Sequence, residues 1–146
     1  MGKTLSLLLL LVNQWCYSQT ENYSSEESLR QEILQMDSLL FDVAFNQCDL
    51  EVYKTIIKDG LEFYDDRTGL NTDVEKEYAS FQDKCSRPFI ETEVSKLGNY
   101  GAVQTGRHTF YNDLVAVQTA KFITIWEKTE NGWIVKRAVS YGHNDL

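Results

Sequence analysis

Two histidines and a pair of adjacent aspartates are the residues of this chain best suited to proton transfer. His108 and His143 are its only histidines, and an imidazole can gain or lose a proton near neutral pH. Asp65 and Asp66 follow a short apolar run, where a carboxylate can act as an acid or a base or can orient a histidine. We therefore predict His108, Asp65 and Asp66 as catalytic candidates. The alternatives stay open: His108 as a hydrogen-bonded wall residue, His143 as an exposed residue, and the aspartates as turn residues.

Sequence motifs for other chemistries are absent. The chain has no serine or cysteine nucleophile motif, no glycine-rich phosphate loop and no nucleotide-binding fingerprint. It also lacks the Cys-x-x-Cys, His-x-His and His-Glu-x-x-His spacings that commonly hold zinc. We therefore expect neither a metal site nor a cofactor.

Four β-rich runs in the second half of the chain would position most of these side chains. Turn residues separate the runs, and the strongest turn signal is the hairpin pair Asn131-Gly132. The predicted strands cover residues 89–97, 102–111, 117–128 and 133–141. Short connections between consecutive strands predict an antiparallel sheet.

Alternation along these strands predicts one surface that is aromatic and partly polar. Successive residues of a strand point to opposite faces, and Arg137 and Tyr141 fall on the same face as His143. Aromatic walls with a few polar groups are typical of a small-molecule pocket, although such residues can equally form a core. A single bulge would reverse any of these assignments. The predicted ligand-binding residues are Tyr64, Gln104, His108, Phe110, Phe122, Trp126, Arg137, Tyr141 and His143.

The first half of the chain shows helical periodicity instead. A capping box at residues 24–27 and apolar residues three to four positions apart predict a helix over about 25–47. Asp49 is expected to cap a second helix that Gly60 ends, and residues 61–65 have strand character. A third helix is predicted from the capping-box pattern at 72–75 to about residue 84, with Glu75 and Glu77 facing solvent. Helices that precede antiparallel strands indicate an α+β fold with the helices on one sheet face.

Several short sequence segments resemble the nuclear transport factor 2-like superfamily. They are residues 46–51, 62–66, 106–111, 120–122 and 140–143. Within this superfamily the chain is similar to the secreted bacterial branch that is classed as a domain of unknown function, near the SnoaL-like proteins. The resemblance covers about residues 25–144. It implies a cone-shaped fold in which a strongly bent antiparallel sheet wraps three helices and leaves a pocket. The superfamily includes isomerases, dehydratases, cyclases, binding modules and assembly domains, so the resemblance does not choose a function.

The first 19 residues have the features of a cleavable signal peptide. Lys3 precedes an apolar run of leucines that is too short to span a bilayer, and Cys16 and Ser18 are small residues that fit a cut after Ser18; a cut after Gln19 is the alternative. We expect a secreted or periplasmic protein with one domain over residues 20–146 and no membrane span after cleavage. Because Lys3 leaves and no acidic residue does, the net charge of −8 becomes −9, which argues against nucleic-acid binding.

Cys48 and Cys85 would be the two cysteines of the mature chain, since Cys16 leaves with the signal peptide. An even number of cysteines in an oxidising compartment makes them candidates for a disulfide. Two buried free thiols are the alternative.

Three functions are compatible with these observations. We favour a non-catalytic pocket for a small apolar or aromatic ligand. The alternative is an acid–base enzyme of isomerase, dehydratase or cyclase type that uses His108 with Asp65 or Asp66. The third is a dimerisation or assembly module, in which the outward sheet face forms a two-fold homodimer. The residues expected on that face are Thr109, Tyr111, Ile123, Ile125 and Ile134.

Overall fold

The computed structural model describes residues 25–81, 87–112 and 114–146. The predicted signal peptide, Cys85 and the predicted end of the third helix lie outside these described residues. The signal peptide and the disulfide between Cys48 and Cys85 therefore stay predictions. No helix of the described part of the chain is long and apolar enough to cross a bilayer.

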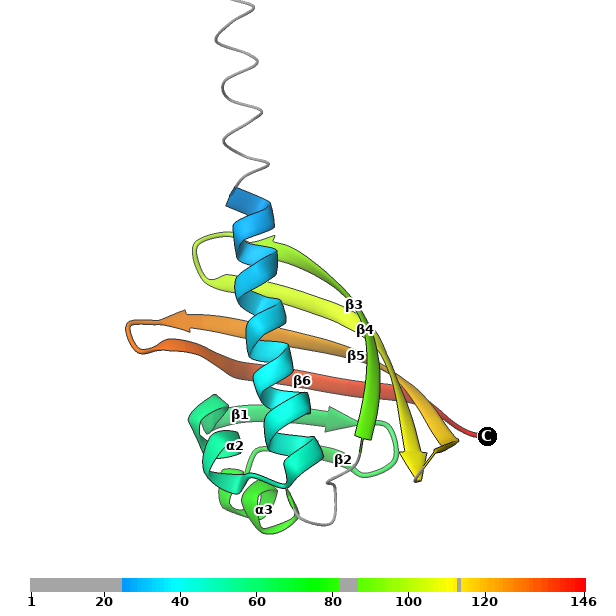
Figure 1. Ribbon diagram of the computed structural model, residues 1–146. Helices are drawn as coiled ribbons and strands as arrows, with labels where there is room; N and C mark the ends of the chain where they lie inside the picture. The colour runs from blue at the N-terminus through cyan, green and yellow to red at the C-terminus, as the bar shows by residue number, and fades with distance from the viewer. Residues whose placement is uncertain (1–24, 82–86, 113) are drawn as a thin grey trace, which may run out of the picture.

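A long N-terminal helix crosses one face of the sheet (Figure 1). It covers residues 25–47, as predicted, but its middle section η1 (Leu39–Phe45) is π-helical. Ile33, Leu40 and Ala44 of this helix are buried and belong to the hydrophobic core. The wider turn of a π-helix changes which side chains face the sheet, and such turns often occur beside functional sites.

The second helix is shorter than the sequence predicted. α2 (Leu50–Ile56) begins at Asp49, whose carboxylate accepts a hydrogen bond from the backbone N–H of Val52 at 3.0 Å, as expected. It ends at Ile56 rather than at Gly60, and β1 (Ile57–Asp65) follows directly. Ile57 is buried and pairs with Val135 in the sheet, so sheet pairing ends the helix early. Gly60 instead occupies an irregular part of β1 with a φ of +80°.

α3 (Val74–Ala79) lies beside α2 and β1 (Figure 1). Its N-cap is Asp73, whose carboxylate accepts from the N–H of Lys76. A short hairpin joins β1 to β2 (Gly69–Asn71) through a turn at residues 66–68, which fits the alternative role of the aspartates as turn residues. Asp65 stabilises this turn because its Oδ1 accepts from the backbone N–H groups of Arg67 and Thr68, both at 2.9 Å.

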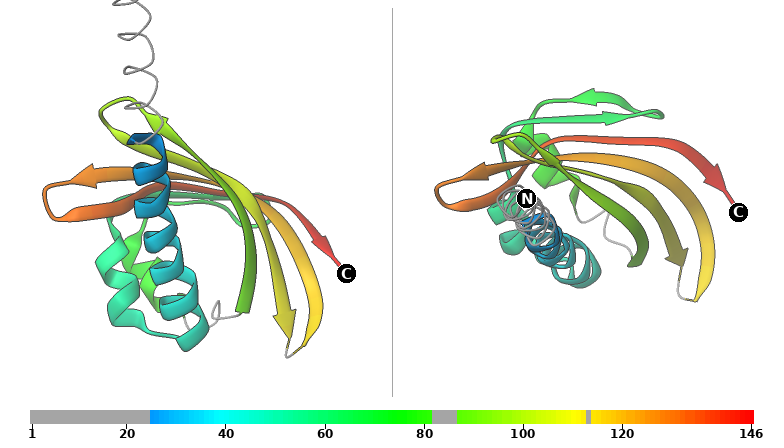
Figure 2. Two further views of the ribbon diagram at one scale, coloured as in Figure 1. Left: turned by 45° about the horizontal axis from the view of Figure 1, so that its top comes forward. Right: turned by 90° about the horizontal axis from the view of Figure 1, so that it is seen from above.

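Six strands form one curved, unclosed sheet in the order β2-β1-β6-β5-β4-β3. Every predicted strand of the second half is present, with longer bounds: β3 (Arg87–Leu97), β4 (Gly101–Asn112), β5 (Val115–Thr129) and β6 (Gly132–Asp145). All neighbours are antiparallel except β1 and β6, which are parallel. Figure 2 shows the strands bending round the long helix. The predicted α+β fold with helices on one face of a strongly bent sheet is confirmed.

Two irregularities in β6 change which of its side chains face the helix. Lys136 is an extra residue, because Trp126 pairs with Val135 while Ile125 pairs with Arg137. A second extra residue follows Tyr141, since Lys121 pairs with Tyr141 but Thr119 pairs with Asn144. The first bulge turns residues 137 to 141 over, and the second turns His143 back toward the helix.

Candidate functional site

A cavity of about 450 Å³ lies between the long helix and the concave face of the sheet. Its walls are mostly apolar and come from the helix, β1, β4, β5 and β6. One part, here called the aromatic wall, consists of Phe41, His108, Phe110 and Phe122. Another part, here called the His143 corner, consists of Asp65, Asp66, Ser140 and His143; all of these except Asp66 line the cavity directly.

The cavity brings together five of the residues that the sequence predicted for the site. They are Asp65, His108, Phe110, Phe122 and His143. The other predicted ligand-binding residues lie elsewhere. Tyr64, Arg137 and Tyr141 are exposed, and Gln104 and Trp126 are fully buried behind the cavity.

Gln104, Trp126 and Asp37 form a hydrogen-bonded group, here called the buried cluster. The Trp126 indole donates to Gln104 Oε1 at 2.7 Å, and the Gln104 amide donates to Asp37 Oδ1. Both Gln104 and Trp126 have no exposed surface. Burial raises the pKa of Asp37 to about 6. The prediction that Gln104 and Trp126 line the pocket is therefore wrong, because both side chains are buried in the core and are hydrogen-bonded to each other there.

Arg137 is on the outer face of the sheet, which corrects its predicted place in the pocket. Its guanidinium donates to both carboxylate oxygens of Glu62, at 2.8 and 3.1 Å. The Tyr64 hydroxyl donates to the same carboxylate, and these hydrogen bonds, chiefly that from Arg137, lower the pKa of Glu62. The bulge at Lys136 is the cause, because it reverses the alternation that the sequence pattern assumed.

His108 is held in apolar surroundings. Its ring lies 4.3 Å from that of Phe122, stacks on Phe110 and meets the edge of Phe41. Its Nδ1 is buried and has no hydrogen-bond partner among the described residues. Burial lowers the pKa of His108 to about 4, so the ring is neutral at physiological pH. The sequence predicted that His108 pairs with Asp65 or Asp66, but both aspartates lie beside His143 instead.

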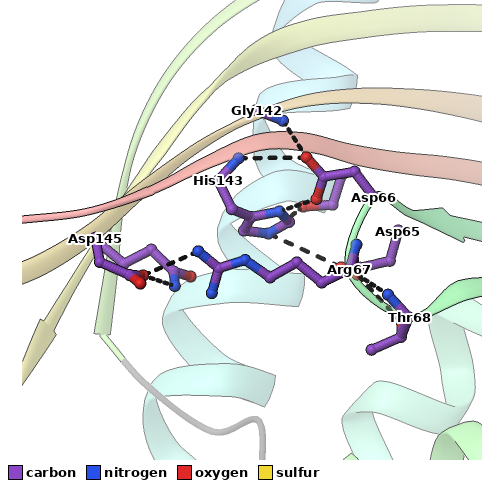
Figure 3. Close-up of polar contacts among 9 residues, drawn as sticks. Asp65, Asp66, Arg67, Thr68, Gly142, His143 and Asp145 are labelled. Carbon is purple, nitrogen blue, oxygen red and sulfur yellow. Dashed lines mark hydrogen bonds and ion pairs between the residues drawn. The ribbon is translucent and has the colours of Figure 1, made fainter.

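His143 is the histidine that has an aspartate partner (Figure 3). Its Nδ1 hydrogen-bonds Asp66 Oδ1, and the backbone N–H of Gly142 donates to Asp66 Oδ2 at 2.6 Å. The hydrogen bond from His143 lowers the pKa of Asp66. On the other side of the ring, Nε2 lies 3.1 Å from the Ser140 hydroxyl and 3.8 Å from Asp65 Oδ2. The His143 side chain is only 8% exposed.

Asp65, Asp66 and His143 are also the residues of the described chain that come nearest to a metal site. One ligand atom from each lies within 4.8 Å of the others. Asp66 meets Nδ1 of the imidazole, however, while Asp65 faces Nε2. Each aspartate thus lies nearest a different ring nitrogen, and both nitrogens already have a hydrogen-bond partner, Asp66 on Nδ1 and Ser140 on Nε2.

Glu77 is a buried carboxylate that the sequence pattern placed in solvent. It is 3% exposed, lines the cavity and accepts hydrogen bonds from the Tyr53 hydroxyl at 2.9 Å and from the Asn71 amide at 3.0 Å. The short α3 buries this residue, so its carboxyl oxygens accept hydrogen bonds from protein donors rather than from water.

No protein-family model matches the sequence, and no curated protein does either. Solved structures do match. An NTF-2 like protein of unknown function from Shewanella oneidensis MR-1 superposes with a TM-score of 0.66 at 18% identity, over 76% of this chain and 97% of that one. The association domain of Caenorhabditis elegans CaMKII superposes with a TM-score of 0.69 at 16% identity, over 81% and 98%.

The chain has the nuclear transport factor 2-like fold. The resemblance stated from the sequence is thus confirmed for the fold, while the secreted branch stays a prediction. A hexachlorocyclohexane dehydrochlorinase, LinA type 2, also has this nuclear transport factor 2-like fold; it superposes with a TM-score of 0.63 at 10% identity, over 88% of this chain and 93% of that one.

Sequence reasoning expected Asp65 or Asp66 to act on or orient a histidine, but it missed that this histidine is His143 and that its partner is Asp66. The available signal was Gly142, whose φ of +66° accompanies the second bulge. A glycine inside a strand pattern suggests a bulge. Read as a bulge, Gly142 brings His143 to Asp66, while the two bulges of β6 together keep His143 on the pocket face that plain alternation had also assigned to it.

Proposed function

We propose that this protein is a secreted or periplasmic binding protein for a small apolar or aromatic molecule that occupies the cavity. The observation that carries this proposal is the hollow of about 450 Å³ with the aromatic wall on one side. Small-molecule sites commonly measure roughly 300–1,000 Å³ and combine apolar walls with a few polar groups. The cavity has both properties.

The polar groups of the cavity favour a ligand without negative charge. Carboxylates of Asp65 and Glu77 line it, and no lysine or arginine is among the described residues that do. His108 supplies no positive charge, because burial keeps its ring neutral. An anion entering the cavity would therefore meet the carboxylates of Asp65 and Glu77 in an apolar setting, and the imidazole of His143 beside them already faces Asp66, so entry is unfavourable.

Native mass spectrometry of the protein purified from its own source tests the binding proposal. We expect a co-purifying organic molecule, and thermal stabilisation by members of a panel of uncharged aromatic compounds. His108→Ala should reduce that stabilisation, because it removes one side of the aromatic wall. Tyr100→Ala, at a residue that is 42% exposed and outside the cavity, is the matched control. A broad panel that stabilises neither protein would contradict ligand binding.

The proposed location rests on the sequence of the first 19 residues. We expect the protein recovered from the periplasm or the culture medium to begin at residue 19 or 20. Its intact mass would show this directly. A full-length mass in the cytoplasmic fraction would contradict secretion.

An acid–base enzyme is the second candidate, and the geometry changes which residues it would use. His143, held by Asp66, is a better base than His108, because its Nδ1 is hydrogen-bonded to a carboxylate while Nε2 lies beside the cavity. One neighbour of the same fold is named a dehydrochlorinase. The test is exchange of a ligand C–H for deuterium in heavy water, followed by NMR. Exchange that His143→Gln abolishes supports the enzyme, and a bound ligand that never exchanges argues against it.

A homodimer formed through the outer sheet face is the third candidate. Ile123, Ile125 and Ile134 are half-buried on that face, and a neighbour of the same fold is named an association domain. Sedimentation at two concentrations would reveal the dimer. Ile125→Asp should then produce monomers, and a variant that stays dimeric would exclude this face as the interface.

A further inference from the structure

Ser140, His143 and Asp66 form a continuous hydrogen-bonded chain at the edge of the cavity. Asp66 Oδ1 hydrogen-bonds His143 Nδ1, and His143 Nε2 lies 3.1 Å from Ser140 Oγ. Ser140 and His143 both line the cavity, whereas Asp66 lies behind the imidazole. Figure 3 shows Asp66 and His143 facing each other across β1 and β6.

These contacts assign a role to each atom. The Asp66 carboxylate can only accept, so His143 Nδ1 carries the proton of that hydrogen bond. In the neutral ring the lone pair is then on Nε2, which faces the Ser140 hydroxyl. A carboxylate that fixes the tautomer, an imidazole that accepts a proton, and a hydroxyl on that nitrogen are the three parts of a serine nucleophile triad.

The three side chains are supported by regular structure. Asp66 follows β1, and its backbone N–H donates to the carbonyl of Ser140 at 3.1 Å. Its Oδ2 accepts from the backbone N–H of Gly142 at the second bulge of β6. Two paired strands therefore fix the carboxylate and the hydroxyl relative to each other, as a preorganised site requires. Asp65 Oδ2, 3.8 Å from Nε2, would stabilise the ring when it is protonated.

We propose that Ser140 is the nucleophile of an esterase activity on small uncharged esters of apolar or aromatic acids. This inference rests on the proposed function, because the cavity must first bind the acyl or aryl group of the ester. The carboxylates of Asp65 and Glu77 that line the cavity disfavour anionic esters.

The reaction proceeds in two balanced stages. Ser140 Oγ attacks the ester carbonyl carbon while its proton passes to His143 Nε2. The tetrahedral intermediate then breaks the bond to the leaving oxygen, which takes that proton and departs as an alcohol or phenol. Water attacks the acyl-serine in the same way, giving a proton to Nε2. The acid leaves as the bond to Oγ breaks, and the proton returns to Ser140.

Hydrolysis of 4-nitrophenyl acetate and butyrate by the purified protein tests this inference. We expect 4-nitrophenol release well above the buffer rate, with loss of that release in Ser140→Ala and in His143→Gln. Ser95→Ala, at an exposed serine of β3, is the matched control and should keep the rate. A fluorophosphonate probe should add its mass to Ser140 alone. A rate that survives Ser140→Ala, or a protein that neither hydrolyses the esters nor takes up the probe, would overturn the proposal.

Ligand binding is measured separately from ester hydrolysis, so that the binding proposal and the esterase proposal can be tested independently of each other. N-(4-nitrophenyl)butyramide has the shape of the ester but resists hydrolysis, and its binding can be followed by calorimetry with the unmodified protein and with Ser140→Ala. Binding to both without ester hydrolysis overturns the esterase inference and leaves the binding proposal standing. Deuterium exchange that survives Ser140→Ala but not His143→Gln would assign the corner to proton transfer instead.

Discussion

Asp37 and Asp66 are two aspartates of one small domain whose surroundings push their pKa values in opposite directions. Asp37, in the buried cluster, has its pKa raised to about 6 by burial. Asp66, in the His143 corner, has its pKa lowered by the hydrogen bond from His143 and by backbone N–H groups. The comparison shows that burial and hydrogen-bond donors act together: Asp37 is buried with one neutral amide to offset the burial, whereas Asp66 is exposed and has an imidazole and two backbone donors.

The buried cluster stabilises the fold, and the His143 corner is placed to do chemistry. Gln104 and Trp126 have no exposed surface, and they do not line the cavity. Ser140 and His143 do line it. Substitutions in the buried cluster should therefore change mainly the free energy of unfolding, while those in the corner should change mainly reactivity. Substitutions at Gln104, Asp37 and Asp66 test this division, and one at His108 tests a third environment, the aromatic wall.

Gln104→Ala should have the largest effect on stability. It removes the amide that joins Asp37 to Trp126, so the Asp37 carboxyl loses a hydrogen-bond donor and the Trp126 indole loses its acceptor. It also opens a cavity in the core. We expect a loss of about 4 kcal/mol in the free energy of unfolding, measured in urea. A loss below about 1 kcal/mol would show that the buried cluster is not a structural element.

His108→Phe should remove a pH dependence from the fold. Burial favours the neutral ring and holds the pKa of His108 at about 4, below the usual 6.5. The folded state therefore binds fewer protons than the unfolded chain between these values, and stability falls as the pH drops through that window. The protein should lose about 3 kcal/mol relative to His108→Phe between pH 7 and pH 4. Urea unfolding of both proteins at several pH values measures this difference. A constant difference across this range would contradict a buried neutral histidine.

Asp37→Asn should stabilise the protein at neutral pH. The pKa of Asp37 is raised from 3.8 to about 6, so the folded state binds more protons than the unfolded chain between these values. Its contribution to stability is therefore lost as the pH rises through that window. The variant should gain about 2 kcal/mol at pH 7 and little at pH 4, as measured by urea unfolding at both values. A variant that is less stable at pH 7 would mean that the charged carboxylate is needed by the cluster.

Asp66→Asn should have the smallest effect on stability and a clear effect on His143. The carboxylate is exposed, so the loss in unfolding free energy should be slight. The ring, however, loses the charged acceptor of its Nδ1–H. We expect the low-field ring N–H proton resonance of His143, assigned with His143→Gln, to move upfield or disappear. An unchanged resonance would mean that Asp66 does not hold the ring.

Local patterns in the sequence predicted most of the fold but only part of the candidate site. The strands and the long helix follow from periodicity, and Asp49 caps its helix as its side chain requires. Arg137 and Tyr141 were assigned to the wrong face, because the bulge at Lys136 depends on how β6 pairs with β5. The partner of His143 was also missed, since Asp66 and His143 are 77 positions apart and meet only through the parallel pairing of β1 and β6.

That parallel pairing has a consequence for the order in which the molecule assembles. The long helix and the antiparallel β4–β5 hairpin can supply the aromatic wall from contacts within themselves and with each other. The His143 corner cannot form from such local contacts, because β1 must first pair with β6, which is synthesised much later. Fraying of β6 would therefore separate Ser140 and His143 from Asp66, while the contacts among Phe41, His108 and Phe122 stay in place.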